Sequence, residues 1–234
     1  MQISYLVSVI IPVHNGARFI KQAIESVLNQ SHTNLEIIVI DDGSIDNTKN
    51  VVLSFPQVNY HYQEHQGVAS ARNKALSMAS GDFIAFLDAD DFYDHKKLEI
   101  QLTYLQNNPA IDICFCHQHN FIEDGFSLSE KDYIHFMENE KIGLITMMVR
   151  KFVFEKVGFF NTIYPNSSDF DWVTRAKDFK HRSVILPDIL LQRRVHDTNL
   201  TLIARKENNV FRFKILKDSI DRKRSLLNNI DGKN

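Results

Sequence analysis

The chain has 234 residues and a formal net charge of −2, with 44 % hydrophobic and 24 % charged residues. This length suits one domain of good size. Because the net charge is close to neutral, we do not expect general binding to nucleic acid. The composition is that of an ordinary soluble globular protein, and no run approaches the roughly 20 apolar residues that cross a bilayer.

The apolar run at residues 5–13 lacks a basic leader and contains Pro12, so we interpret it as a strand rather than a signal peptide. The two cysteines, Cys114 and Cys116, lie too close together to form a disulfide framework. A cytoplasmic protein is therefore expected.

Apolar strands alternate with amphipathic helices through the first half of the sequence. The predicted strands are residues 7–11, 35–40, 58–62 and 82–87. The predicted helices are residues 18–30, 46–53 and 68–79. This alternation indicates an α/β fold with a mostly parallel sheet covered on both faces, and such sheets bind ligands at the carboxyl ends of their strands.

The second half is less regular. A helix is expected from about Asp94 to Asn107, a strand at 111–117 and a helix at 166–179, whereas 123–140 is polar and acidic and is expected to be a loop with some helix. No internal repeat or low-complexity linker divides the chain.

Three carboxylates, Asp88, Asp90 and Asp91, directly follow the strand at 82–87. Neighbouring carboxylates repel unless a positive group lies between them, and a hard divalent cation is the usual one. The alternative is that Asp90 and Asp91 cap the helix near Asp94. On this segment alone the two interpretations are equal.

The loop before Val68 is expected to direct free N–H groups toward the strand ends, where Arg72 would help them to bind an anion such as a diphosphate. The alternative is an ion pair between Arg72 and a neighbouring carboxylate.

Ordered blocks in the first 100 residues resemble the opening of an inverting family 2 glycosyltransferase. The blocks are residues 7–15 (VSVIIPVHN), 30–31 (QS), 39–44 (VIDDGS), 67–73 (GVASARN) and 81–91 (GDFIAFLDADD). The resemblance implies a GT-A fold, a nucleotide diphosphate sugar as donor, with UDP favoured by family habit, and Mn²⁺ or Mg²⁺.

The resemblance also implies roles for single residues. Those expected to bind the nucleotide sugar are Pro12, His14, Asn15, Asp42, Arg72, Asp88 and Asp91. Asp90 is expected to hold the metal. His14 stands where the family often has Tyr.

Two further segments of the second half resemble family motifs. Gly158 followed by Ser168-Asp169-Phe170-Asp171 is similar to the segment that carries the catalytic base of the family. We assign the base to Asp169, with Asp171 as the alternative. The structural interpretation is that Asp169 only caps its helix. Arg194, His196 and Asn199 fit an Arg-x-His-x-x-Asn block, which implies that His196 binds the metal or the diphosphate.

We therefore expect a GT-A domain at residues 1–204, with a nucleotide-sugar half at about 1–95 and an acceptor half at 96–204. Residues 205–234 form a basic helical extension, either packed on the domain or touching a membrane surface through 205–224. The expected function is metal-dependent transfer of a sugar to an acceptor hydroxyl of a glycan, lipid-linked glycan, peptide or small molecule. A non-catalytic nucleotide-sugar binding module and a sugar-phosphate nucleotidyltransferase are the alternatives.

Overall fold

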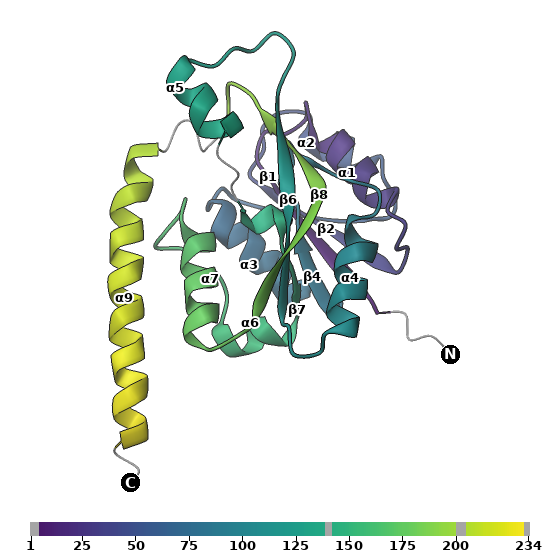
Figure 1. The fold of residues 1–234 in the computed structure, drawn as a ribbon. Helices are drawn as coiled ribbons and strands as arrows, with labels where there is room; N and C mark the ends of the chain where they lie inside the picture. The colour runs from purple at the N-terminus through teal and green to yellow at the C-terminus, as the bar shows by residue number, and fades with distance from the viewer. Residues whose placement is uncertain (1–4, 139–141, 200–204, 232–234) are drawn as a thin grey trace.

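A computed structural model describes residues 5–138, 142–199 and 205–231 as one sheet flanked by helices (Figure 1). In this part of the chain the sheet has eight strands in the order β3-β2-β1-β4-β7-β6-β8-β5. The strands are β1 Val7–Val13, β2 Leu35–Asp42, β3 Val58–Gln63, β4 Phe83–Phe86, β5 Phe92–Tyr93, β6 Ile113–Ile122, β7 Met148–Arg150 and β8 Ser183–Val195.

The described α-helices are α1 Ile20–Leu28, α2 Thr48–Leu53, α3 Val68–Met78, α4 Lys97–Asn107, α5 Glu130–Tyr133, α6 Phe152–Val157, α7 Ser168–Asp178 and α9 Arg205–Asp231. A π-helical turn, Ile134–Glu138, follows α5, and a 3₁₀ turn, Leu144–Thr146, precedes β7. The π-helical turn lies within residues 123–140, the polar stretch that is expected to be a loop with some helix.

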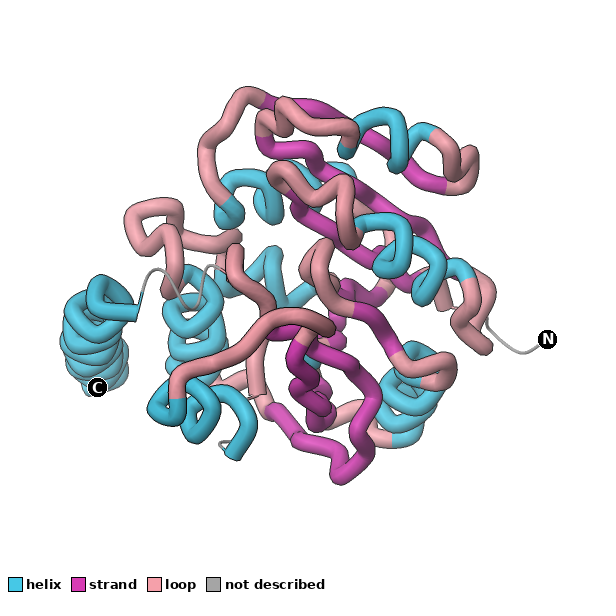
Figure 2. The backbone as a smooth tube through the Cα atoms, turned by 90° about the horizontal axis from the view of Figure 1, so that it is seen from above, coloured by secondary structure: helices cyan, strands magenta, loops and turns pink. Residues whose placement is uncertain are grey.

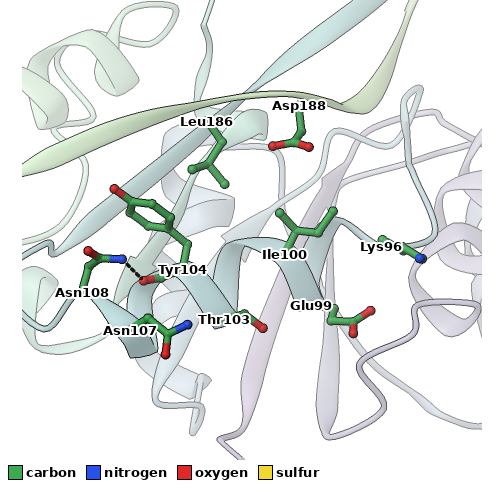
Figure 3. Close-up of a pocket in the computed structure, with 9 residues that line it drawn as sticks. All are labelled: Lys96, Glu99, Ile100, Thr103, Tyr104, Asn107, Asn108, Leu186 and Asp188. Atoms are coloured by element: carbon green, nitrogen blue, oxygen red, sulfur yellow. Dashed lines mark hydrogen bonds between the residues drawn. The ribbon is translucent and has the colours of Figure 1, made fainter.

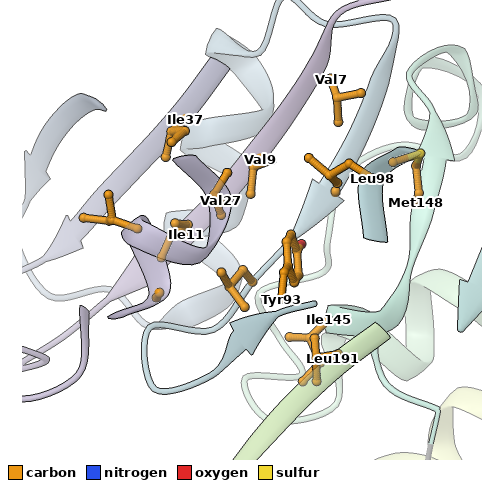
Figure 4. Packing of buried hydrophobic residues seen from close by; sticks show 14 of the residues in the cluster. Val7, Val9, Ile11, Val27, Ile37, Tyr93, Leu98, Ile145, Met148 and Leu191 are labelled. Carbon is orange, nitrogen blue, oxygen red and sulfur yellow. The ribbon is translucent and has the colours of Figure 1, made fainter. Parts of the chain in front are cut away.

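Alternation along the strands divides the core into two layers. Val9 and Ile11 of β1 face one layer, which also contains the buried side chains of α1, α2 and α4 (Figure 4). Ile10 faces the other layer, with the buried side chains of α3, α6 and α7. Because both faces of the sheet are covered, its central strands are apolar at almost every position.

The first four strands form the parallel part of the sheet. β1 lies between β2 and β4 and is parallel to both, and β3 is parallel to β2. β7 then runs antiparallel between β4 and β6, and β6 pairs in parallel with β8. The carboxyl ends of β1, β2 and β4 consequently lie at one edge, as expected, and the α/β fold class is confirmed.

The structure corrects the expected helix after the acidic cluster. Instead of beginning near Asp94, α4 begins at Lys97, and β5 lies between it and Asp91. The cap interpretation of Asp90 and Asp91 is therefore wrong. β8 is absent from the sequence prediction because its exposed Ile185 and Ile189, next to an irregular register against β6, obscure the alternation of a strand.

The C-terminal helix α9 stands at the outside of the molecule. In Figure 2 it is seen almost end-on, with α7 between it and the sheet. None of the described helices combines the length and apolar composition that crossing a lipid bilayer requires. The expected domain boundary at 204 falls in residues 200–204, which lie outside the described residues.

Candidate functional site

The three carboxylates after β4 each contact a different distant segment. Asp88 Oδ1 accepts a hydrogen bond from Arg72 Nη2 of α3 at 2.7 Å. Asp90 Oδ2 lies 2.9 Å from Nε2 of His196, and Asp91 Oδ1 accepts from the backbone N–H of Arg194 at 2.8 Å. The acidic cluster is therefore the place where α3 and the end of β8 meet the sheet edge.

Asp88 and Arg72 form an ion pair at the inner side of this cluster. Arg72 is buried, and its Nε has no hydrogen-bond partner among the described residues. Asp88 keeps 39 % of its side-chain surface exposed, yet desolvation raises its pKa against the opposing charge of Arg72. The buried guanidinium therefore keeps an unused donor, its Nε–H, and it lies beside a carboxylate that solvent can reach.

The contact between Asp90 and His196 brings together the two residues expected to hold a metal. Asn199 Nδ2 donates a second hydrogen bond to Asp90 Oδ2 at 3.0 Å, and His196 Nδ1 lies 2.9 Å from the hydroxyl of Thr198. The imidazole is buried, whereas the Asp90 side chain is 28 % exposed. The ring is thus oriented by its neighbours while the carboxylate still faces solvent.

Asp91 differs from its two neighbours because it is only 3 % exposed. Burial, and then the negative charges of Asp90 and Asp88, raise its pKa well above the ordinary value, while the Arg194 N–H acts in the opposite direction. Arg194 also donates from Nε to the backbone oxygen of Asp90 at 3.2 Å. Asp91 therefore fixes the end of β8 against the acidic loop.

Asp42, at the end of β2, occupies the start of α3. Its carboxylate accepts from the backbone N–H groups of Gln66 and Gly67 at 2.9 and 2.8 Å and from Gln63 Nε2 at 2.7 Å. For the amides of Gln66 and Gly67, the expectation that the loop N–H groups are free to bind a diphosphate is wrong, because the buried Asp42 carboxylate already accepts their hydrogen bonds.

A pair of imidazoles covers the ends of β1 and β2. The rings of His14 and His65 lie 4.3 Å apart, and His14 Nδ1 contacts the backbone oxygen of Asp42 at 2.8 Å. Asn15 joins the two strand ends, since its N–H donates to Ser44 Oγ and its Oδ1 accepts from the N–H of Ile45. His65 carries no motif signal of its own, although it lies two residues before the block that begins at Gly67.

Pro12 is buried within β1, opposite Ile40 of β2. Proline has no N–H to donate, but no hydrogen bond to β4 is lost, because the pairing of β1 with β4 ends at Ile10. Pro12 thus lies where the parallel sheet opens toward the candidate site.

The two carboxylates in the first turn of α7 have different surroundings. Asp171 is buried and accepts from Arg175 Nε at 2.8 Å, and Arg175 also donates to the backbone oxygens of Val157 and Phe159. Asp169 is half-buried, and its Oδ1 accepts from the N–H of the next residue, Phe170, at 2.8 Å. Of the two, Asp169 is the accessible carboxylate.

The segment before α7 is joined to the helix that carries Arg72. Asn73, the next residue of α3, exchanges two hydrogen bonds with the backbone of Phe160, both of 2.9 Å. Trp172 Nε1 donates to the backbone oxygen of Gly158 at 2.8 Å. The start of α7 is thereby held in a fixed relation to α3, through contacts with backbone atoms that residue types alone do not predict.

The donor atoms of Asp90 and His196 fit a hard or borderline divalent cation. No group of three His, Cys, Asp or Glu side chains within the described ranges could enclose such an ion. Mn²⁺ and Mg²⁺ are commonly bound by one or two protein ligands together with substrate phosphates and water. The residues present suit a metal shared with a substrate, rather than a closed protein site.

A shallow pocket lies elsewhere, between α4 and β8 (Figure 3). Its lining includes Ile100, Tyr104, Leu186 and Asp188, and none of the candidate site residues. It plays no part in the site described above.

The sequence matches a known protein family and several curated proteins. The model of the family "Glycosyl transferase family 2" matches residues 8–164. An uncharacterized glycosyltransferase of Rickettsia typhi is 33 % identical over 217 residues, which cover 86 % of this chain and 67 % of that protein. The UDP-Glc:α-D-GlcNAc-diphosphoundecaprenol β-1,3-glucosyltransferase of Escherichia coli is 38 % identical over 155 residues, covering 62 % of this chain and 60 % of the relative.

Solved structures share the fold at low identity. Residues 1–349 of Staphylococcus aureus TarS in complex with UDP-GlcNAc match with a TM-score of 0.68 and 19 % identity, covering 82 % of this chain and 59 % of that one. A mannosyltransferase from Pyrobaculum calidifontis, in complex with GDP-Man and Mn²⁺, matches with a TM-score of 0.66 and 20 % identity, covering 86 % and 60 %. At this identity the matches establish the fold.

Proposed function

The chain belongs to glycosyltransferase family 2, and on that basis we propose that it transfers a sugar from a UDP-sugar to an acceptor hydroxyl with inversion at the anomeric carbon. The observation that carries the proposal is the contact of Asp90 with His196 at the sheet edge, beside the Arg72–Asp88 pair. UDP is favoured because the E. coli relative is named for UDP-Glc and TarS binds UDP-GlcNAc. The GDP-Man complex of the mannosyltransferase keeps a GDP-sugar as the second choice.

The strand ends of β1 and β2 form the proposed nucleotide site. The exposed His14 and His65 rings offer a face on which a base can stack, and Asn15 holds the loop beneath them. The Asp42 carboxylate is saturated by its hydrogen bonds, so we assign it to positioning His65 and the start of α3. Asp88 and Arg72 then face the ribose and diphosphate, respectively.

Asp90 and His196 are the proposed metal ligands, and the hydroxyl and backbone N–H of Thr198 orient the imidazole through Nδ1. A divalent cation bound there supplies positive charge that offsets the charge growing on the leaving diphosphate. The buried Arg72 adds a fixed positive charge on the same side. Asp91 supports this arrangement by holding Arg194 and the end of β8.

Asp169 is the proposed general base. Displacement at the anomeric carbon requires that the attacking hydroxyl lose its proton, and Asp169 is a half-buried carboxylate at the start of α7. Asp171 is not assigned this role, because its charge is already neutralised by Arg175. The acceptor class that the relatives suggest is a lipid-linked glycan, after the diphosphoundecaprenol acceptor in the name of the E. coli enzyme.

The test is release of nucleotide diphosphate from a panel of UDP- and GDP-sugars, with Mn²⁺, with Mg²⁺ and with EDTA. We expect metal-dependent release of UDP from at least one sugar, lowered about 10²-fold or more by Asp90→Ala. Asp188→Ala is the control, because this exposed carboxylate precedes Arg194 by six residues on the same strand. Binding without turnover would indicate a nucleotide-sugar binding module instead, and release of pyrophosphate from a nucleoside triphosphate would indicate a nucleotidyltransferase.

A further inference from the structure

The helix α9 is attached to the rest of the chain along one of its faces. Ile215 and Ser219 are buried, and the Ser219 hydroxyl donates to Asp178 of α7 at 2.8 Å. Tyr164 donates to Asp218 of α9 at 2.9 Å. These contacts hold α9 beside α7 (Figure 1), together with Arg222, which donates to Asp178 at 3.0 Å.

A second apolar stripe runs along the outer side of the same helix. Phe213, Leu216 and Ile220 are 77 %, 47 % and 51 % exposed. Their spacing of three and four residues places them within an arc of about 60°, roughly 130° around the helix from Ile215. Three large apolar side chains in a row on solvent mark a surface that contacts something else.

Basic residues lie on both sides of this stripe. At about 100° per residue, Arg212 and Lys223 fall on one side and Lys217 and Arg224 on the other, and all four are exposed. Arg212 and Lys223 also contact α7, through the Phe170 ring at 5.4 Å and Asp178 at 3.2 Å, so this side of the stripe lies next to α7. Arg224 on the other side lies 3.8 Å from Asp221 of α9 itself. Residues 210–224 contain six basic and two acidic residues, although the whole chain carries a net charge of −2.

We propose that this outer face of α9, formed by Phe213, Leu216 and Ile220 with their flanking basic residues, binds flat on an anionic lipid surface. The apolar side chains would enter the interface while the Lys and Arg head groups contact lipid phosphates. A second copy of the chain is a poor occupant, because pairing two such stripes brings basic rows from both copies together with no acidic row to match them. The inference does not depend on the catalytic proposal.

The experiment is co-sedimentation of the full chain with vesicles of phosphatidylcholine alone or with about 30 % phosphatidylglycerol. We expect binding to the anionic vesicles only, and a loss of binding as NaCl rises from about 0.1 M to about 0.5 M. Phe213→Ser with Ile220→Ser, and separately Lys217→Glu with Arg224→Glu, should each weaken partitioning at least about tenfold. The matched control is Lys49→Glu with Leu53→Ser on α2, where Leu53 is 54 % exposed.

Equal binding to both kinds of vesicle, or equal binding of the α9 variants and the wild type, would overturn the proposal. So would a wild-type dimer that the Phe213→Ser, Ile220→Ser variant converts to a monomer without any change in vesicle binding. Because these side chains are exposed, far-UV circular dichroism and the thermal midpoint should be unchanged in every variant. Nucleotide-sugar turnover without lipid should also be unchanged, which separates this result from a failure of the proposed activity.

Discussion

The chain contains two Asp-x-Asp segments whose backbones differ, and the difference decides what each carboxylate can do. Asp88 and Asp90 lie in a turn after β4, closed by the Asp91 N–H donating to the Asp88 oxygen at 3.1 Å, and both reach partners from distant segments, Arg72 and His196. Asp169 and Asp171 lie two residues apart in the first turn of α7, and so they are separated by about 200° around the helix. The loop therefore gathers two carboxylates into one site, whereas the helix directs one inward to Arg175 and leaves the other accessible.

The largest effect is expected from removing the accessible carboxylate of α7. Asp169→Asn should lower sugar transfer about 10³-fold, since an amide cannot accept the proton of the acceptor hydroxyl. Donor binding, measured by calorimetry with UDP and Mn²⁺, should change by less than about threefold, because the proposed nucleotide site lies at the strand ends. Transfer at the wild-type rate would remove Asp169 from the role of base and erase the functional difference between the two segments.

The inward carboxylate should affect stability instead. Asp171→Asn leaves Arg175, whose side chain is 15 % exposed, without its counter-ion, although its bonds to Val157 and Phe159 remain, and we expect a loss of about 2 kcal/mol in the free energy of unfolding. Urea denaturation measures this loss. Transfer by the fraction that remains folded should stay within a few-fold of wild type.

The change from Asp to Asn at position 169 should have a much smaller effect on stability than the change at position 171. Asp169→Asn should change the unfolding free energy by less than about 1 kcal/mol, because the side chain is half-buried and bonds only its own helix start among the described contacts. If Asp171→Asn proved as stable as wild type and as inactive as Asp169→Asn, the assignment of the two carboxylates would have to be exchanged.

A pair of glycines tests how tightly the strand-end region is packed. Gly43 and Gly67 both have positive φ, +81° and +88°, so Ala at either position is strained, and at Gly67, where ψ is 161°, the strain is about 1–3 kcal/mol. An added Cβ at Gly43 would lie 2.8 Å from the backbone nitrogen of His65, whereas at Gly67 nothing lies within 4 Å. Both variants should therefore lose stability in urea denaturation, but only Gly43→Ala should displace the backbone of His65.

Gly43→Ala should also weaken UDP binding, since the backbone that must shift carries His65. Equal affinity of the two variants for UDP would show that the loops after β2 and β3 adjust freely, and that the His14–His65 face is not preorganised.

The sequence predicts those parts of the molecule whose structure follows from the pattern of a single segment. β1, β2 and β4 are continuous apolar runs, and the acidic loop follows β4 wherever that strand ends. The proximity of Asp90 and His196 was expected from the family resemblance, and the contact is present, while the metal itself stays a prediction.

The remainder depends on partners that carry no local signal. The contact of Asp91 with Arg194 uses a backbone N–H, which every residue except proline has, so no residue type could indicate it. The hydrogen bond from the Gly67 N–H to Asp42 could not be predicted either, because the two residues are 25 positions apart and only the sheet brings them together. Sequence predicts which groups lie at the sheet edge, and the structure decides which of them are already neutralised.

The smallest effect on function, and the sharpest test of packing in the irregular half, concerns the thiols of β6. Cys114 and Cys116 are buried, and burial raises the pKa of Cys114 from 9.0 to about 12. Because the thiolate is the reactive form, roughly 10⁻⁴ of Cys114 would be ionised at pH 8, and thiol reagents should not modify it in the folded protein. Titration with a chromogenic disulfide should detect no thiol before guanidinium is added and two afterwards.

The sign of the pH dependence follows from the same shift. A thiol whose pKa is higher in the folded state stabilises the fold below pH 9, and this contribution is lost as the pH rises from 9 toward 12. Replacing both cysteines by Ala should therefore flatten the fall in stability over that range while leaving transfer unchanged. Rapid labelling of the folded chain would show that β6, which has an antiparallel neighbour in β7 and an irregular register against β8, is packed less firmly than the parallel strands that hold the acidic loop.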